Sequence, residues 1–156
     1  MIQNEWAKKC VEVQNEEEEI LIVKMHTGKK PINIVTTYGK QEAGESEAKE
    51  EITQQMNMWE QAIIQMQIKG EHILWIGDLN VKVGNDTQGI KGNHSDVTYG
   101  GKMLRNIIKK RDLQLINATE KCRGLWTRIN TGNKDQKSIL DYVIANRKEN
   151  KGDANR

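Results

Sequence analysis

Aromatic residues and proline are scarce in this sequence. Its 156 residues include no phenylalanine, four tryptophans, three tyrosines and one proline, Pro31. Hydrophobic residues make up 36% of the chain and charged residues 29%. A chain of this length is the size of one ordinary domain and buries about 68–70% of its unfolded surface on folding. We therefore expect a single globular domain over residues 1–156, with a core that is lean for its length.

The sequence also lacks long apolar runs and clustered cysteines. No stretch approaches the roughly 18 apolar residues that would span a bilayer, and the N-terminal segment MIQNEWAKKC has no apolar signal-peptide core. We therefore expect an intracellular protein, nuclear or cytoplasmic, with no membrane partner. Cys10 and Cys122 are isolated, so we interpret them as reduced structural thiols rather than metal ligands or a disulfide.

The charge of the chain is small overall but unevenly distributed. Residues 1–99 carry 10 basic and 16 acidic side chains, a net charge of −6. Residues 100–156 carry 14 basic and 6 acidic side chains, a net charge of +8. Such a basic region is typical of a surface that faces a polyanion such as DNA, but it is equally compatible with an ordinary solvated surface.

The pattern of apolar residues predicts a mixed α/β protein. Residues 20–25 and 32–38 read as a β-hairpin around a turn at 28–31. Residues 45–69 read as a long helix, because apolar side chains recur every three or four positions and Gly70 follows. Further strands are expected at 73–76, 113–117, 125–129 and 138–145, and a second helix at 102–111. Strands and helices in this order indicate an α+β or layered α/β fold.

The segment ILWIGDLN, residues 73–80, is the strongest candidate for a functional site. Asp78 and Asn80 follow a strand that is apolar throughout, and ligands often bind at the carboxyl ends of such strands. In an extended chain these two side chains would point to the same side. The carboxylate of Asp78 is suited to a hard cation or a water, and the amide of Asn80 to a phosphate oxygen. The structural alternative is an Asx turn that ends the strand.

A second candidate is Asp141, within the segment SILDY. A carboxylate in an otherwise apolar strand needs a partner such as a histidine, an arginine or a metal if it is buried. The alternative is a surface residue at the end of a strand. The histidines His26, His72 and His94 have no zinc-like spacing, so we expect them to be structural or exposed. The polar segment 84–101 is long for a loop, and loops of this kind tend to be functional.

Taken in order along the chain, these segments resemble a known superfamily. TTYGKQE, a helix, ILWIGDLN, a helix followed by NATE, LWTR and SILDYVIAN are similar to the endonuclease/exonuclease/phosphatase superfamily, above all to the endonuclease domains of non-LTR retrotransposons. The resemblance covers about residues 20–146. It implies a four-layer α/β/β/α sandwich of the deoxyribonuclease-like type, present here in part, with a site that uses Mg²⁺ or Mn²⁺ and with DNA as the partner.

The resemblance also implies roles for four residues. Asp78 would orient the attacking water and is a possible metal ligand, while Asn80 and Tyr38 would contact the scissile phosphate. Asp141 would orient a catalytic histidine. A bound metal would polarise the phosphate and neutralise developing charge. No protein partner is implied.

The sequence departs from the family pattern at both ends. Only 37 residues precede Tyr38, and they contain no recognisable counterpart of the metal-binding glutamate. Only 15 residues follow Asp141, and none of them is a histidine. We therefore expect an incomplete, retroelement-derived, endonuclease-like phosphodiesterase domain, related by ancestry to DNA-nicking enzymes but inactive as this chain. The alternatives are a non-catalytic nucleic-acid-binding module and an inositol or lipid phosphatase of the same superfamily.

Overall fold

The computed structural model describes residues 4–13, 19–42, 46–85, 96–117, 127–129, 132 and 137–147. Six strands form the main sheet in the order β1-β2-β3-β4-β8-β5. These strands are β1 (Cys10–Val13), β2 (Ile20–Met25), β3 (Ile32–Tyr38), β4 (His72–Asp78), β5 (Leu113–Leu115) and β8 (Asp141–Asn146). The helices are α1 (Asn4–Ala7), α2 (Ser46–Ile68) and α3 (Tyr99–Lys110). A small two-stranded sheet pairs β6 (Arg128–Ile129) with β7 (Lys137–Ser138).

The predicted hairpin is formed by β2 and β3, next to the edge strand β1. β2 pairs antiparallel with β3, and the turn between them places Gly28 at a φ of 80°, which suits glycine. From β3 the chain crosses through α2 to β4, which pairs parallel with β3. A parallel pair needs a long connection of this kind. β8 then pairs antiparallel with β4 and with β5, so β4 lies at the centre of the sheet.

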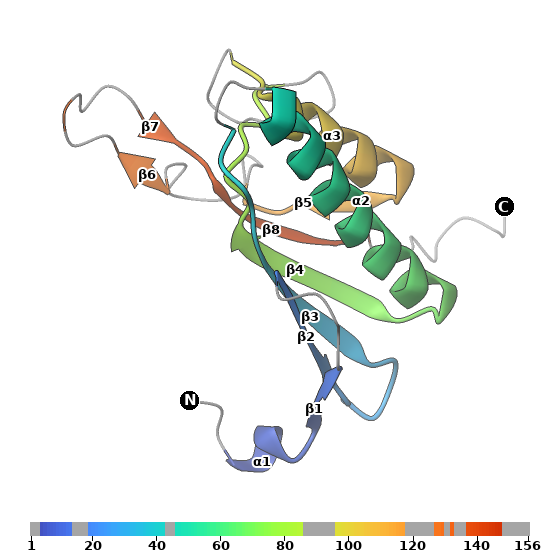
Figure 1. Cartoon of the computed structure of the whole chain (residues 1–156). Helices are drawn as coiled ribbons and strands as arrows, with labels where there is room; N and C mark the ends of the chain where they lie inside the picture. The colour runs from blue at the N-terminus through green and yellow to red at the C-terminus, as the bar shows by residue number, and fades with distance from the viewer. Residues whose placement is uncertain are drawn as a thin grey trace, which may run out of the picture.

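Helices α2 and α3 lie on the same face of the main sheet (Figure 1). Five apolar side chains of α2 form its buried stripe: Ile52, Met56, Trp59, Ile63 and Met66. The sheet contributes alternate residues to the same core, among them Val35, Trp75 and Ile144. The rings of Trp59 and Trp75 meet edge to face, with their centroids 5.5 Å apart. The core therefore fills the space between one helical layer and one face of the sheet.

The ends of the helices follow from local sequence. Gly70, at a φ of 63°, ends α2, and the amide of Glu71 donates to the carbonyl of Met66. Thr98 caps α3, because its hydroxyl accepts from the amide of Gly101 at 3.2 Å. The carboxylate of Glu42, from the loop after β3, accepts from the amide of Tyr99 at 2.9 Å. The start of α3 is thus tied to the segment that follows Tyr38.

The mixed α/β class is confirmed, and the described residues supply one helical layer and one large sheet of the sandwich. Several details differ from the sequence-based prediction, and one is that the strand expected at 113–117 ends at Leu115. The strand expected at 138–145 is split into β7 and β8, because Leu140 and Asp141 both donate their amides to the hydroxyl of Thr127 instead of continuing one ladder. Helix α3 begins at Tyr99, earlier than expected, where Thr98 caps it. The short elements α1 and β1 were not predicted.

Some predicted segments lie partly outside the described residues. They are the strand at 125–129, of which 127–129 are described, and the loop at 84–101. Within the part of the chain that the structure describes, no helix combines the length and apolar character needed to cross a membrane.

Candidate active site

The sheet aligns three of the predicted site residues in one row. Tyr38 is the register partner of Asp78 across the parallel pair β3–β4, and Asp78 is the partner of Asp141 across the antiparallel pair β4–β8. Register partners point to the same face of a sheet, and this face is the one opposite the helices. Tyr38 is 61% exposed, Asp141 is exposed, and Asp78 is half-buried. The row therefore places a phenol and two carboxylates together at one end of the main sheet.

Two glycines allow the strand ends that carry this row to approach closely. A Cβ atom on Gly77 would lie 2.0 Å from the carbonyl oxygen of Thr37, and one on Gly39 would lie 2.1 Å from that of Leu79. Both distances are shorter than any real carbon–oxygen contact, so no larger residue fits without a backbone shift. The amide of Gly39 donates to the carbonyl of Asp78 at 2.7 Å. The two glycines thus join the exits of β3 and β4.

Asn80 lies next to this junction, but not through strand alternation as the sequence suggested. β4 ends at Asp78, and Asn80 adopts a φ of 50°. The carboxylate of Asp78 accepts from the amide of Asn80 at 3.0 Å, which is the Asx turn that was the structural alternative. The side-chain amide of Asn80 donates to the carbonyl of Gly39 at 2.7 Å. The second N–H group of this amide donates to none of the described residues and could therefore donate to a ligand.

Asp141 is not the buried carboxylate that would have required a partner. It is the first residue of β8, and its side chain is exposed, so the surface interpretation is correct. Its backbone is held firmly, because its amide donates to the hydroxyl of Thr127 and its carbonyl accepts from the side chain of Asn117 at 2.8 Å. The carboxylate is therefore exposed to solvent beside Asp78.

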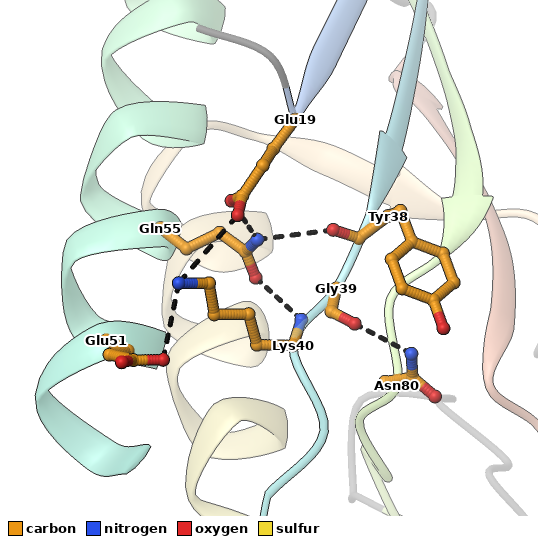
Figure 2. Close-up of polar contacts among 7 residues, drawn as sticks. All are labelled: Glu19, Tyr38, Gly39, Lys40, Glu51, Gln55 and Asn80. Carbon is orange, nitrogen blue, oxygen red and sulfur yellow. Dashed lines mark hydrogen bonds and ion pairs between the residues drawn. The ribbon is translucent and has the colours of Figure 1, made fainter. Parts of the chain in front are cut away.

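A buried glutamine supports the tyrosine end of the row, and the sequence analysis did not identify it. Gln55, on α2, is 4% exposed. It donates to the carbonyl of Tyr38 at 3.2 Å and accepts from the amide of Lys40 at 2.9 Å. Figure 2 shows it between Glu19 and the exit of β3, with a further hydrogen bond to the Glu19 carboxylate. The signal in the sequence was a polar residue on the apolar stripe of α2.

Tyr142, next to Asp141, fixes the loop after Asn80. Its hydroxyl lies 2.9 Å from the carbonyls of Val81 and Ile139, and the amide of Val83 lies 3.4 Å from it. The side chain is 1% exposed, and burial raises the pKa of its hydroxyl well above the usual value. Tyr142 is therefore a neutral structural residue that ties β8 to the segment following Asn80.

The row offers few ligands for a metal. Among the described residues, no group of three or more His, Cys, Asp or Glu side chains could hold an ion. His72 opens β4 and pairs in register with Ile32, so it lies at the opposite end of the sheet from Asp78. His26 follows β2 at that same opposite end, and His94 and Cys122 lie outside the described residues. The described side chains thus do not form a protein cage for Mg²⁺ or Mn²⁺.

Comparisons with known proteins identify the fold. No protein-family model matches the chain, and a search of curated protein sequences gives no match. Solved structures do match. The endonuclease domain of TRAS1, a telomere-specific non-LTR retrotransposon, has a TM-score of 0.56 at 14% identity, with 88% of this chain and 56% of that one covered.

Two further structures give the same result. The human Nocturnin catalytic domain, with bound sulfate, has a TM-score of 0.52 at 10% identity over 89% of this chain and 45% of its own. An endonuclease/exonuclease/phosphatase family protein from Bacteroides thetaiotaomicron has a TM-score of 0.50 at 14% identity over 82% and 40%. The chain spans about half the length of these proteins. It therefore has the fold of the endonuclease/exonuclease/phosphatase superfamily, over the part of that fold which it covers.

Proposed function

We propose that this chain is a retroelement-derived, endonuclease-like domain that keeps the phosphate-contacting part of a phosphodiesterase site and has little or no catalytic activity. The observation that carries the proposal is the row of Tyr38, Asp78 and Asp141, with Asn80 beside it. In an active site of this kind, Asp78 would orient the attacking water. The free N–H of Asn80 and the hydroxyl of Tyr38 would donate to oxygens of a DNA phosphate.

The proposed lack of activity rests on the residues around this row. Asp141 would be expected to orient a histidine, but both described histidines lie at the other end of the sheet. The loss of a general acid or base typically costs about 10²–10⁴-fold in rate. Mg²⁺ or Mn²⁺ would neutralise charge on the phosphate if it bound, but the described carboxylates are too few to hold it alone.

A plasmid-nicking assay tests the proposal. The full chain is incubated with supercoiled plasmid and Mg²⁺ or Mn²⁺, beside an Asp78→Ala variant. A Glu50→Ala variant is the matched control, because Glu50 is an exposed carboxylate on α2, which covers the sheet face opposite the row. We expect the three proteins to give the same background of nicked plasmid. Robust nicking by the natural chain and by Glu50→Ala that disappears in Asp78→Ala would contradict the proposed inactivity.

A second candidate function is non-catalytic binding of nucleic acid through the basic part of the chain. Lys102, Lys109 and Arg128 are exposed, and residues 100–156 carry a net charge of +8. Part of this charge is neutralised, because Lys110 and Arg111 pair with Glu60. Strongly salt-dependent DNA binding that does not involve Tyr38 or Asn80 would favour this candidate.

A further inference from the structure

Helix α3 carries only positive charge. Its 12 residues include four basic side chains and no acidic one. By contrast α2, beside it on the same face of the sheet (Figure 1), has one lysine and four glutamates. The segment 96–112, which adds Arg111 and an aspartate at each end, still has five basic and two acidic residues, a net charge of +3. α3 is therefore a basic element next to an acidic one.

Three of these cations share one side of α3. Lys102, Arg105 and Lys109 are three and four positions apart, so they lie within a sector of about 60° around the helix axis. Met103 contacts Thr53 of α2 from another side of the helix, so the three cations face away from α2. Lys102 and Lys109 are exposed and Arg105 is half-buried. We call these three residues the basic flank.

Carboxylates do not neutralise the basic flank within the described part of the chain. Lys110 pairs with Glu60 on the α2 side, but none of the three flank residues forms an ion pair with a described residue. Arg105 donates to the backbone carbonyl of Asn85 at 2.6 Å, which leaves its charge uncompensated. Lys102 lies in the first turn of α3, where the helix dipole disfavours a cation. The stability of the helix therefore does not account for a lysine there.

The basic flank lies beside the segment that follows Asn80. The amide of Thr98 donates to the carbonyl of Lys82 at 3.1 Å, and the amide of Lys102 donates to the carbonyl of Thr98 at 3.0 Å. Arg105 contacts the same segment three residues beyond Lys82. The flank thus begins one helical turn from a residue that is two positions beyond Asn80.

A phosphate backbone fits the spacing and the chemistry of this flank. Lys102 and Lys109 are seven residues apart, which is about 10.5 Å along the helix axis. Duplex DNA carries one phosphate per about 3.4 Å of each strand, so about three phosphates of one strand span that distance. A membrane surface fits less well, because an interfacial helix inserts its apolar face. The apolar side chains of α3, Leu104, Ile107 and Ile108, are already buried in the core.

We propose that the basic flank of α3 binds the phosphate backbone of duplex DNA, without reading the base sequence. The inference rests on the second candidate function, nucleic-acid binding, for which it names the surface. It does not depend on the phosphate contacts proposed for Tyr38 and Asn80. Lysines that neutralise phosphates release counterions, so the affinity should fall steeply as salt is added.

Fluorescence anisotropy of the full chain with a labelled DNA duplex, over a series of salt concentrations, tests the basic flank. Lys102→Ala with Lys109→Ala should weaken binding at low salt by at least about tenfold. The slope of log affinity against log salt should become shallower by about two. Lys8→Ala with Lys49→Ala is the matched control, because both lysines are exposed outside α3 and the net charge changes equally. Circular dichroism confirms that each variant is folded.

An Asn80→Ala variant separates this inference from the phosphate contacts proposed for the row. It removes a neutral donor, so any loss of affinity should leave the salt slope unchanged. Weaker binding by Asn80→Ala, with none by the Lys102→Ala, Lys109→Ala chain, would support the row and overturn the basic flank. Equal weakening by the two double-lysine variants would overturn it too, because only bulk charge would then matter. So would an absence of DNA binding at low salt, or tighter binding to phosphatidylserine–phosphatidylcholine vesicles than to the duplex.

Discussion

Gln55 supports the candidate site from the buried side of α2, through hydrogen bonds to the backbone beside Tyr38. Its amide group satisfies the carbonyl of Tyr38 and the amide of Lys40, the two backbone groups at the exit of β3. Buried polar groups without partners cost about 1–3 kcal/mol each. Gln55 therefore holds Tyr38 in line with Asp78, and it acts on the row through the backbone rather than through contact with substrate.

Replacement of Gln55 by leucine keeps the size of the side chain but leaves both backbone groups unsatisfied. We expect Gln55→Leu to lower the free energy of unfolding by about 1–3 kcal/mol. Gln54→Leu is the matched control, because Gln54 is exposed on the same turn of α2, and it should change stability by less than about 0.5 kcal/mol. Urea denaturation measures both. Equal effects of the two substitutions would show that the Gln55 hydrogen bonds contribute nothing.

The residues of the row differ in how far the sequence predicted their placement. Asp78 and Tyr38 could be placed because each ends a strand whose apolar pattern is clear. The geometry of Asn80 could not, because its φ of 50° results from the hydrogen bonds to Asp78 and Gly39 rather than from strand alternation. The exposure of Asp141 depends on Thr127, which interrupts the strand before it. The contacts of Asn80 with Gly39 and of Asp141 with Thr127 join segments that are distant in the sequence, whereas the Asx turn between Asp78 and Asn80 is local.

The two long helices are joined by a partly buried ion pair. Glu60 of α2 contacts Arg111, just after α3, and Lys110. Burial alone would raise the pKa of Glu60, but the hydrogen bonds and charges of Arg111 and Lys110 outweigh it and lower the pKa below the usual value. A carboxyl whose pKa is lower in the folded state stabilises the protein above its unfolded-state pKa. That contribution is lost as the pH falls through the folded-state pKa.

Glu60→Gln should therefore reduce the loss of the free energy of unfolding that the natural chain shows as the pH falls below neutrality. At neutral pH we expect the variant to be less stable by about 1–3 kcal/mol, since charge-assisted hydrogen bonds are lost. The difference should shrink toward zero below the normal range of glutamate titration, where the natural side chain is protonated as well. Thermal melts over a pH series measure this, with Glu50→Gln as an exposed control on the same helix. A difference between Glu60→Gln and the natural chain that does not change with pH would contradict the account.

The elements that the sequence predicted well are those with an unbroken local pattern. β2 and β3 were predicted with their observed bounds, and α2 to within one residue at each end. In α2, the apolar side chains that recur every three or four positions are the ones that are buried, and Gly70 lies where the helix ends. β1 was missed because its four residues are largely exposed and mixed with charge. Its position comes from pairing with β2, which no pattern within β1 itself reveals.

At the scale of the whole molecule, the main sheet has one face packed against helices and one face that the described helices do not cover. The helices cover the core side of the main sheet (Figure 1), while the candidate site lies at one end of the uncovered side. The chain matches about half the length of the solved structures that share its fold. The candidate site therefore lies at the end of the sheet face that the described helices do not cover.

The claim that Tyr38 and Asn80 are the phosphate-contacting part of this surface is tested most directly by a ¹⁵N NMR titration of the full chain with a short DNA duplex. The account predicts chemical-shift changes at the amides of Gly39, Asn80 and Tyr142, which an Asn80→Ala variant reduces. Shifts confined to α3 and the residues around it would contradict the account and favour binding through the basic part of the chain. An absence of shifts at the row in the presence of saturating DNA would contradict it equally.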